Sequence, residues 1–204
     1  MNPTIADPRL YSPQCTSLTP VEKVHENPWF CVFNRGGYFT VENKHPQVLV
    51  LPIVDNNFVV MVRVKRPVIA DDTLELPAGG AKVNESALVA AQRELREETG
   101  IYIANVNRFQ LQAPLVLAPR VPCLAHIFHI HLTQKEFAGR SAHDNEIISV
   151  ERFSFKEVLK MIENNQMYLG FQIAILVRFL LQNQQIVSAP DLKKEKLNAQ
   201  RFKS

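Results

Sequence analysis

The sequence predicts an α/β fold of the α+β kind, in which a mixed sheet packs between helices and a small β-rich segment comes first. Three observations support this. The near-continuous apolar runs 47–54 and 58–64 are typical of strands buried on both faces. An amphipathic helical pattern near the middle of the chain has strand-like runs on either side of it. Two further apolar helical patterns follow the last of these runs.

Composition limits the classes to which the protein can belong. The 204 residues are 46% hydrophobic and 21% charged, as in an ordinary globular domain, and the formal net charge of +3 is too small to indicate nucleic-acid binding. No stretch is long enough to span a membrane, and no apolar run typical of a signal peptide is present. Three widely spaced cysteines without a zinc spacing, Cys15, Cys31 and Cys123, predict reduced thiols in the cytoplasm.

The N-terminal part is predicted to have two segments. Residues 1–20 contain four prolines without apolar periodicity and should form an extended arm. Residues 21–45 should form a small β-rich segment, because the strand-like runs 29–33 and 38–41 flank Asn34-Arg35-Gly36-Gly37, a favourable hairpin turn. A lone hairpin is only marginally stable, so this segment must pack against another surface.

The main domain is predicted over residues 46–185, and a polar basic tail over 186–204. The strands 47–54 and 58–64 should be joined by a turn at Asp55-Asn56-Asn57, and a short strand at Leu74 should lead toward the central helix. Beyond that helix we expect strands around 109–112, 124–132 and 147–153, then a helix capped by Ser154 through residue 162 and another over 168–182.

The central helix should begin at Asn84, a fair N-cap, and end at Gly100, which suits a C-terminal stop. Ala87, Leu88, Ala91 and Leu95 form its apolar stripe.

Glu94, Glu97 and Glu98 fall together on another face of the same helix. Like charges at this spacing repel by roughly 0.2–0.5 kcal/mol per pair, and the helix dipole disfavours anions in the last turns. A bound divalent cation would remove this cost, since Mg²⁺ prefers carboxylate and carbonyl oxygens. The alternative is a solvated charged face on which Arg93 pairs with Glu97.

The residues around these glutamates decide between the two interpretations. Gly79 is followed after five residues by Glu85, after seven more by Arg93-Glu94-Leu95, and then, with single-residue gaps, by Glu97-Glu98 and Gly100-Ile101. This matches every fixed position of the signature of the Nudix hydrolases, so the chain resembles that family. The resemblance implies an α/β/α sandwich and hydrolysis of a diphosphate linkage.

Flanking residues extend the resemblance over about 25–165 to one branch of the family, the ADP-ribose and ADP-sugar pyrophosphatases. They are Glu75-Leu76-Pro77-Ala78-Gly79, Arg66-Pro67 and Ala118-Pro119. That branch has an N-terminal β-rich segment that is often exchanged or packed across a homodimer, and 29–41 would match it. Arg120 and Val64 depart from the branch, which usually has glycine and glutamine there, so the pocket could prefer another nucleotide sugar.

The resemblance also implies roles for residues in and next to the signature. Glu94, Glu97 and Glu98, with the carbonyl of Ala78, would hold Mg²⁺, with Mn²⁺ as the alternative. Arg93, helped by Glu85, would hold Glu94 in place. Gly79 and Gly100 would support this arrangement as the signature glycines.

Substrate contacts are expected outside the signature. By resemblance, Arg66 would hold a phosphate, with a structural salt bridge as the alternative, and Glu75 and Pro119 would line the substrate site. Trp29 would stack on a base or else fill a dimer core. Glu146 is the candidate general base, with Asp144 and His143 as rivals and a plain solvated loop as a further alternative. His126, His129 and His131 alternate in one strand and are interpreted as strand residues rather than metal ligands.

The sequence therefore predicts a Mg²⁺-dependent homodimeric pyrophosphohydrolase that cleaves ADP-ribose or a related nucleoside diphosphate sugar into a nucleoside monophosphate and a sugar phosphate. It predicts neither a nucleic-acid partner nor a membrane partner. The alternatives are a Nudix hydrolase for GDP-mannose or a dinucleoside polyphosphate, and a sensor that binds nucleotide sugars without cleaving them.

Overall fold

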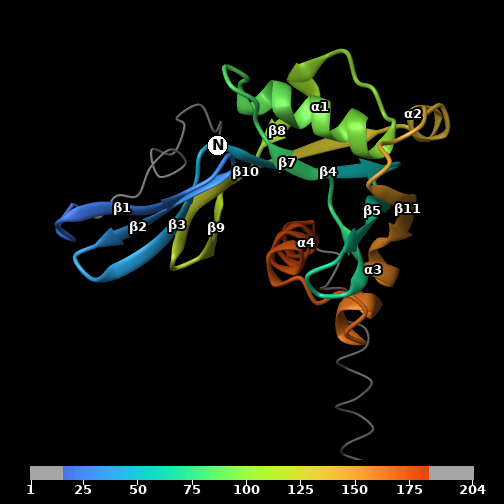
Figure 1. Cartoon of the computed structure of the whole chain (residues 1–204). Coiled ribbons are helices and arrows are strands. Elements are labelled where there is room, and N and C mark those ends of the chain that lie inside the picture. The colour runs from blue at the N-terminus through green and yellow to red at the C-terminus, as the bar shows by residue number, and fades with distance from the viewer. Residues whose placement is uncertain (1–15, 184–204) are drawn as a thin grey trace, which may run out of the picture. The chain divides into compact units, whose positions relative to one another are not determined.

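The computed structural model describes residues 16–183, and the chain divides into two compact units after Ser154 (Figure 1). Cys15, the tail 186–204, most of the arm 1–20 and the side chain of Cys123 lie outside the described residues. Cys31 is buried and free of any disulfide.

The first unit contains an eight-stranded sheet whose central order is β11-β5-β4-β10-β8. Strands β4 and β10 are parallel, while β4 and β5 and their other neighbours are antiparallel, so the predicted mixed sheet and fold class are confirmed. Its strands are β4 (Gln47–Val54), β5 (Phe58–Arg66), β6 (Asp71–Glu75), β7 (Ala78–Gly80), β8 (Gln110–Leu111), β9 (Leu115–Ala118), β10 (Val121–Leu132) and β11 (Ile147–Ser154).

A separate three-stranded sheet, β1 (Val21–Glu26), β2 (Phe30–Arg35) and β3 (Tyr38–Asn43), precedes it. The predicted hairpin is confirmed, although its turn is shorter than expected, with Gly36 and Gly37 at φ of 59° and 91°. The turn between β9 and β10 joins the two sheets: the Val41 N–H donates to the Arg120 carbonyl over 2.8 Å, and Arg120 Nη1 donates to the Phe39 carbonyl over 3.0 Å.

Helix α1 (Ala87–Thr99) is the predicted central helix, but its N-cap is Ser86 rather than Asn84. Ser86 accepts a hydrogen bond from the Val89 N–H, while Asn84 lies in a turn with φ of 63°. The Glu85 carboxylate is bonded to the Lys82 N–H and to Arg93, which keeps residues 82–85 outside the helix. Gly100 ends the helix in the left-handed conformation at φ of 71°, as predicted.

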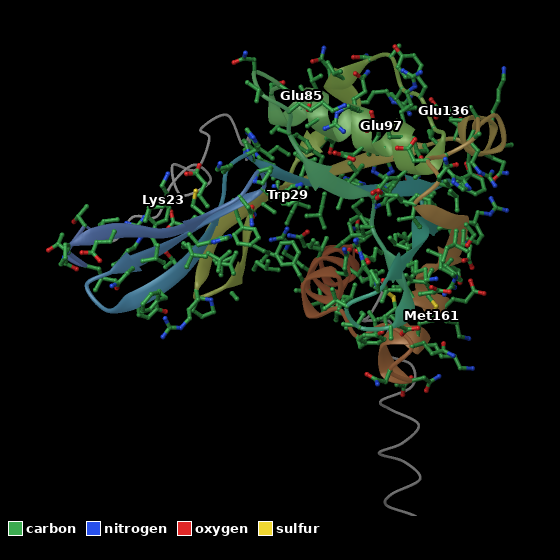
Figure 2. All side chains as sticks on the ribbon, viewed as in Figure 1. Lys23, Trp29, Glu85, Glu97, Glu136 and Met161 are labelled. Carbon is green, nitrogen blue, oxygen red and sulfur yellow. The ribbon has the colours of Figure 1, made fainter. Side chains whose placement is uncertain are left out.

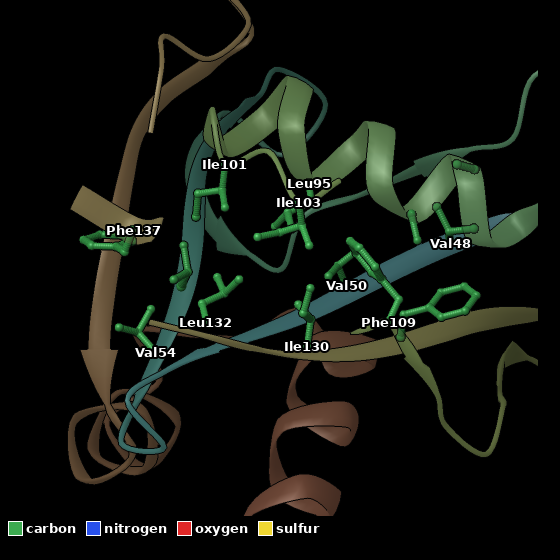
Figure 3. Close-up of a cluster of buried hydrophobic side chains, with 14 of the residues drawn as sticks. Val48, Val50, Val54, Leu95, Ile101, Ile103, Phe109, Ile130, Leu132 and Phe137 are labelled. Atoms are coloured by element: carbon green, nitrogen blue, oxygen red, sulfur yellow. The ribbon is translucent and has the colours of Figure 1, made fainter. Parts of the chain in front are cut away.

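The core beneath α1 is formed by apolar side chains of the helix and the sheet (Figure 3). Leu95 of α1 packs there with residues of β4 and β10, among them Val48, Val50 and Ile130. Every residue of β4 after Gln47 is buried, in agreement with a strand covered on both faces. The first unit is completed by the 3₁₀ turn η2 (Val106–Arg108) and by α2 (Gln134–Ala138), which begins with a Thr133–Glu136 capping box.

The second unit contains α3 (Phe155–Glu163) and α4 (Gly170–Gln182), close to the two predicted C-terminal helices. The rings of Phe155 and Phe179 meet edge to face, with their centroids 5.7 Å apart. Across residues 16–183, no helix is long and apolar enough to cross a membrane.

Candidate active site

Strand β7 brings a backbone segment against the acidic side of α1. Pairing of Ala78 with Leu49 of β4 sets the position of Ala78 along the sheet. Its N–H donates to Oε2 of Glu98 over 3.0 Å. One backbone residue and one helical carboxylate, predicted to share a role, therefore lie in direct contact.

Arg93 is the centre of the acidic cluster. Its Nε and Nη2 donate to the two Glu85 oxygens, each over 2.9 Å, and Nη2 also donates to the Gly80 carbonyl over 2.9 Å. Its Nη1 reaches Glu94 over 2.8 Å and Glu97 over 2.7 Å. These carboxylates, Glu85 foremost, raise the pKa of Arg93 further. Figure 2 labels Glu85, in the loop before α1, and Glu97, on α1 itself.

Gly79 permits the close approach of β7 to Glu94. A Cβ at this position would lie 2.2 Å from Glu94 Oε1, well inside van der Waals contact. Glu94 is 8% exposed, so its carboxylate has little room to move away. A side chain at position 79 would therefore displace the carboxylate.

Burial also sets the charge of the two inner glutamates. It raises the pKa of Glu98 to about 8, and the nearby charges of Glu94 and Glu75 add to this effect against the hydrogen bond from Ala78. Burial likewise raises the pKa of Glu94, although Arg93 opposes the change. Both carboxylates are thus held where a nearby positive charge would favour their ionised form.

The donor set fits a hard divalent cation in its chemistry, because all the candidate ligands are oxygens. Within residues 16–183, however, no three His, Cys, Asp or Glu side chains are gathered closely enough to hold a metal ion as they stand. Glu94 and Glu97 are turned toward Arg93, and Glu98 toward the Ala78 N–H. Binding would need these side chains to turn away from their present hydrogen-bond partners.

Arg66, at the end of β5, is paired with Glu75 of β6. Its Nε and Nη2 donate to the two carboxylate oxygens over 2.6 and 2.9 Å, and the Thr73 hydroxyl donates to the same carboxylate over 2.7 Å. Glu75 is buried, whereas 49% of the Arg66 side chain is exposed. Arg66 therefore forms the salt bridge given as the alternative, and its side chain remains half exposed.

Sequence reasoning did not identify Thr73 or Lys82 as part of this region. Thr73 lies two residues before Glu75, so both side chains share one face of β6, a spacing that could have revealed the pair. The Lys82 ammonium lies 3.6 Å from Glu97, but no local pattern distinguishes it from other exposed lysines.

The loop that carries Glu146 is docked onto the end of α1. The Ser141 N–H donates to the Gly100 carbonyl and the Asp144 N–H to the Glu97 carbonyl, each over 2.9 Å. Glu146 is exposed, and its charge, after those of Glu75 and Glu98, helps to raise the pKa of Arg66. The structure thus brings Glu146 into the electrostatic range of Arg66. His143 directs its Nδ1 to the Asp144 carbonyl, 3.0 Å away.

Trp29 and Pro119 come from segments other than those that form this cluster. Trp29 is 73% exposed in the loop before β2 (Figure 2), and Pro119 lies in the turn between β9 and β10. In the part of the chain that the structure describes, no hydrogen bond or ion pair joins either to the glutamates of α1. Arg120, which stands where the related branch usually has glycine, stacks on Tyr38. Its guanidinium carbon is 4.1 Å from the ring centroid.

The three histidines of β10 do not all alternate: His129 and His131 are two residues apart and share one face of the strand, whereas His126 lies on the other face. His126 and His129 are buried, and the rings of His129 and His131 are 4.3 Å apart. Burial, followed by the charge of His131, lowers the pKa of His129 to about 4.

Several known proteins are similar to this chain in sequence or in fold. The family model of the NUDIX domain matches residues 43–169. An ADP-ribose pyrophosphatase of Bacillus subtilis (strain 168) is 26% identical over 126 residues, covering 61% of this chain and 67% of that protein. A methanol dehydrogenase activator of Bacillus methanolicus is 28% identical over 142 residues, covering 67% and 73%. A crystal structure of an ADP compounds hydrolase is similar in fold, with a TM-score of 0.55 at 20% identity, covering 81% of this chain and 93% of that one.

Proposed function

The chain belongs to the Nudix family and is a hydrolase that acts on pyrophosphate bonds, and we propose that its substrate is ADP-ribose or a related nucleoside diphosphate sugar. The products would be a nucleoside monophosphate and a sugar phosphate. The observation that carries the proposal is the Arg93-centred network, which holds Glu85, Glu94 and Glu97 at the helix beside the Ala78–Glu98 contact. The name of the Bacillus subtilis relative and the flanking residues 75–79 support the choice of substrate.

Nudix hydrolases generally need a divalent cation, and we propose Mg²⁺ here, with Mn²⁺ as the alternative. Glu94, Glu97, Glu98 and the Ala78 carbonyl would hold it. When bound, the ion would neutralise charge on the phosphate oxygens and stabilise the leaving phosphate. Arg93 keeps Glu94 and Glu97 oriented, and Gly79 leaves space for the Glu94 carboxylate.

The remaining steps belong to residues outside the helix. Glu75 and Thr73 fix the Arg66 guanidinium, whose exposed part would bind a substrate phosphate. Water would attack phosphorus, the bridging phosphorus–oxygen bond would break, and Glu146 would accept the proton of the water. Docking of residues 141–144 onto Gly100 and Glu97 supports Glu146 in this role, because it ties that loop to α1.

The proposed assembly is a homodimer formed through the N-terminal sheet, in the cytoplasm. Its strands leave Val21, Val24 and Phe39 about half exposed, and Trp29 is more exposed still. Covering such side chains contributes roughly 25 cal/mol per Å² of apolar area, which favours a partner surface. In that arrangement Trp29 would approach a nucleotide site and stack on the base.

A substrate panel tests the proposal. ADP-ribose, another ADP-sugar, GDP-mannose and a dinucleoside polyphosphate are incubated with the enzyme and Mg²⁺, with Mn²⁺, or with a chelator, and the products are separated by chromatography. ADP-ribose or the other ADP-sugar should show the highest kcat/KM and give a nucleoside monophosphate. A clear preference for GDP-mannose or the dinucleoside polyphosphate would overturn the choice of substrate.

A further inference from the structure

A groove lies on the side of α1 that faces away from Glu98. It has a volume of about 450 Å³, and it is lined by residues of α1 together with Glu85, Tyr102, Ser141, Ala142 and Asp144. Val89, Gln92 and Arg96 line it and share one helical face, because they are spaced by three and four residues. Glu98 follows Arg96 by two residues and so points roughly 200° away around the helix. The volume lies within the range of small-molecule sites.

An aromatic platform forms one part of this groove. Tyr102, a residue that is 61% exposed, lines it, and the Arg96 guanidinium carbon is 5.6 Å from the centroid of its ring. Exposed tyrosine rings stack on nucleobases, and such stacking does not need a particular base. The groove therefore offers a surface for a flat heterocycle.

Charged groups stand on both walls. Across the described residues 16–183 Arg96 forms no ion pair, and its stack on Tyr102 pre-orients a guanidinium fork that matches a phosphate. On the opposite wall, Asp144 presents a carboxylate, the group that commonly accepts hydrogen bonds from ribose hydroxyls. Hydrogen bonds of Ser141 and Asp144 N–H groups to α1 carbonyls hold that wall in place.

We propose that this groove is an accessory site for a ribonucleoside monophosphate. The base stacks on Tyr102, the phosphate binds Arg96, and the ribose hydroxyls donate to Asp144. The groove adjoins the catalytic centre, because Glu85, Arg93 and Glu97 are among the residues that line it. A nucleotide bound there would therefore touch the network that orients Glu94.

Calorimetric titration with AMP tests this site on the full chain, with a chelator present so that the proposed catalytic metal plays no part. AMP should bind the wild type, and Arg96→Gln and Tyr102→Leu should each weaken binding at least about tenfold, since hydrogen bonds to charged groups and stacking contacts are each of this size. Arg140→Gln is the matched control: Arg140 also stacks on an aromatic ring, Phe137, but does not line the groove. It should leave the affinity unchanged, as should Glu98→Gln.

Adenosine and ribose 5-phosphate separate the two contacts. Adenosine binding should depend on Tyr102 but not on Arg96, and ribose 5-phosphate binding the reverse. The proposal is overturned if millimolar AMP does not bind, if neither groove variant changes its affinity, or if Glu98→Gln abolishes binding. These outcomes are independent of hydrolysis, so the groove and the proposed substrate can fail separately.

Discussion

The Ala78 N–H donates to the Glu98 carboxylate over 3.0 Å, linking residues that are 20 positions apart in the sequence. This contact joins β7, the edge of the sheet, to the last turns of α1. It places a backbone residue and a buried carboxylate, both predicted to bind a cation, side by side. The predictions below follow from this contact and from the network around it.

Glu98→Gln should remove most of the stabilisation that Mg²⁺ gives the protein. A ligand present at a hundred times its dissociation constant raises the free energy of unfolding by about 2.7 kcal/mol. The glutamine oxygen can still accept from Ala78, so the fold should persist while metal affinity falls. Thermal unfolding with and without Mg²⁺ measures this shift. Glu22→Gln, the same change on an exposed strand, should keep the wild-type increase in unfolding temperature with Mg²⁺. An equal increase in both variants would mean that Glu98 is not a metal ligand.

Arg66→Ala and Glu75→Gln should have similar effects on the KM for the accepted nucleotide sugar. If Arg66 binds a phosphate and Glu75 orients it, either change raises KM with a smaller effect on kcat, and the double variant is little worse than Arg66→Ala alone. Steady-state kinetics of the three variants gives this coupling. Unchanged KM in Arg66→Ala would assign the pair a purely structural role.

Gly100→Ala should destabilise the protein more than Gly37→Ala does. Both glycines have positive φ, which costs roughly 1–2 kcal/mol for another residue. A Cβ at Gly100 would in addition lie 2.1 Å from the Ser141 carbonyl oxygen, whereas a Cβ at Gly37 would have no atom within 4 Å. Denaturant unfolding of the two variants compares these costs. Equal destabilisation would show that the loop 141–146 can move away freely.

Stability should fall in acid partly because of His129. Its pKa is about 4 in the folded protein and 6.5 in the unfolded chain, so the unfolded state binds the proton first. Above pH 6.5 His129 is neutral in both states and does not lower the free energy of unfolding. As the pH falls from about 6.5 to about 4, its titration lowers the free energy of unfolding by up to about 3 kcal/mol. The free energy of unfolding of His129→Gln should depend less steeply on pH in this window. Identical slopes for variant and wild type would contradict this assignment.

The protein should sediment as a dimer of roughly twice 23.2 kDa at low micromolar concentration. Val24→Asp, on the exposed face of β1, should shift it toward the monomer, because a desolvated charge at an interface is costly. A fully active wild-type species near 23.2 kDa would instead mean that Trp29 serves its own chain.

The apolar runs of the sequence predicted the central strands well, because a strand buried on both faces has an unambiguous pattern. The run 47–54 coincides with β4. Strand β1 was not identified as a strand, since all six of its residues are exposed and its two valines stand among glutamate, lysine and histidine. Strand β7 has only three residues, two of them glycine, and exists because β4 supplies its hydrogen-bond partner. Such pairing is tertiary and has no local signal.

The spacing of the signature predicted that Glu94, Glu97 and Glu98 share one helix. It did not predict which hydrogen-bond partner each of them has. That Arg93 forms its two-point pair with Glu85, while sharing one nitrogen between Glu94 and Glu97, depends on where the loop before α1 runs. Docking of Ser141 onto Gly100 joins segments about forty residues apart, which no periodicity can predict. The N-cap is Ser86 rather than the predicted Asn84 for the same reason, because the Glu85 carboxylate pairs with Arg93.

The most direct test of the central claim is the rate of nucleoside monophosphate release from ADP-ribose while Mg²⁺ is restored to chelator-treated enzyme. Wild type and Glu22→Gln should regain activity together as Mg²⁺ is added. Loss of an outer contact to a metal site already costs 10–100-fold, so Glu94→Gln and Glu98→Gln should each lower kcat by about a hundredfold or more. Near-normal turnover in both variants, at saturating substrate and the same Mg²⁺ concentration, would contradict the assignment of the α1 carboxylates to metal-assisted cleavage.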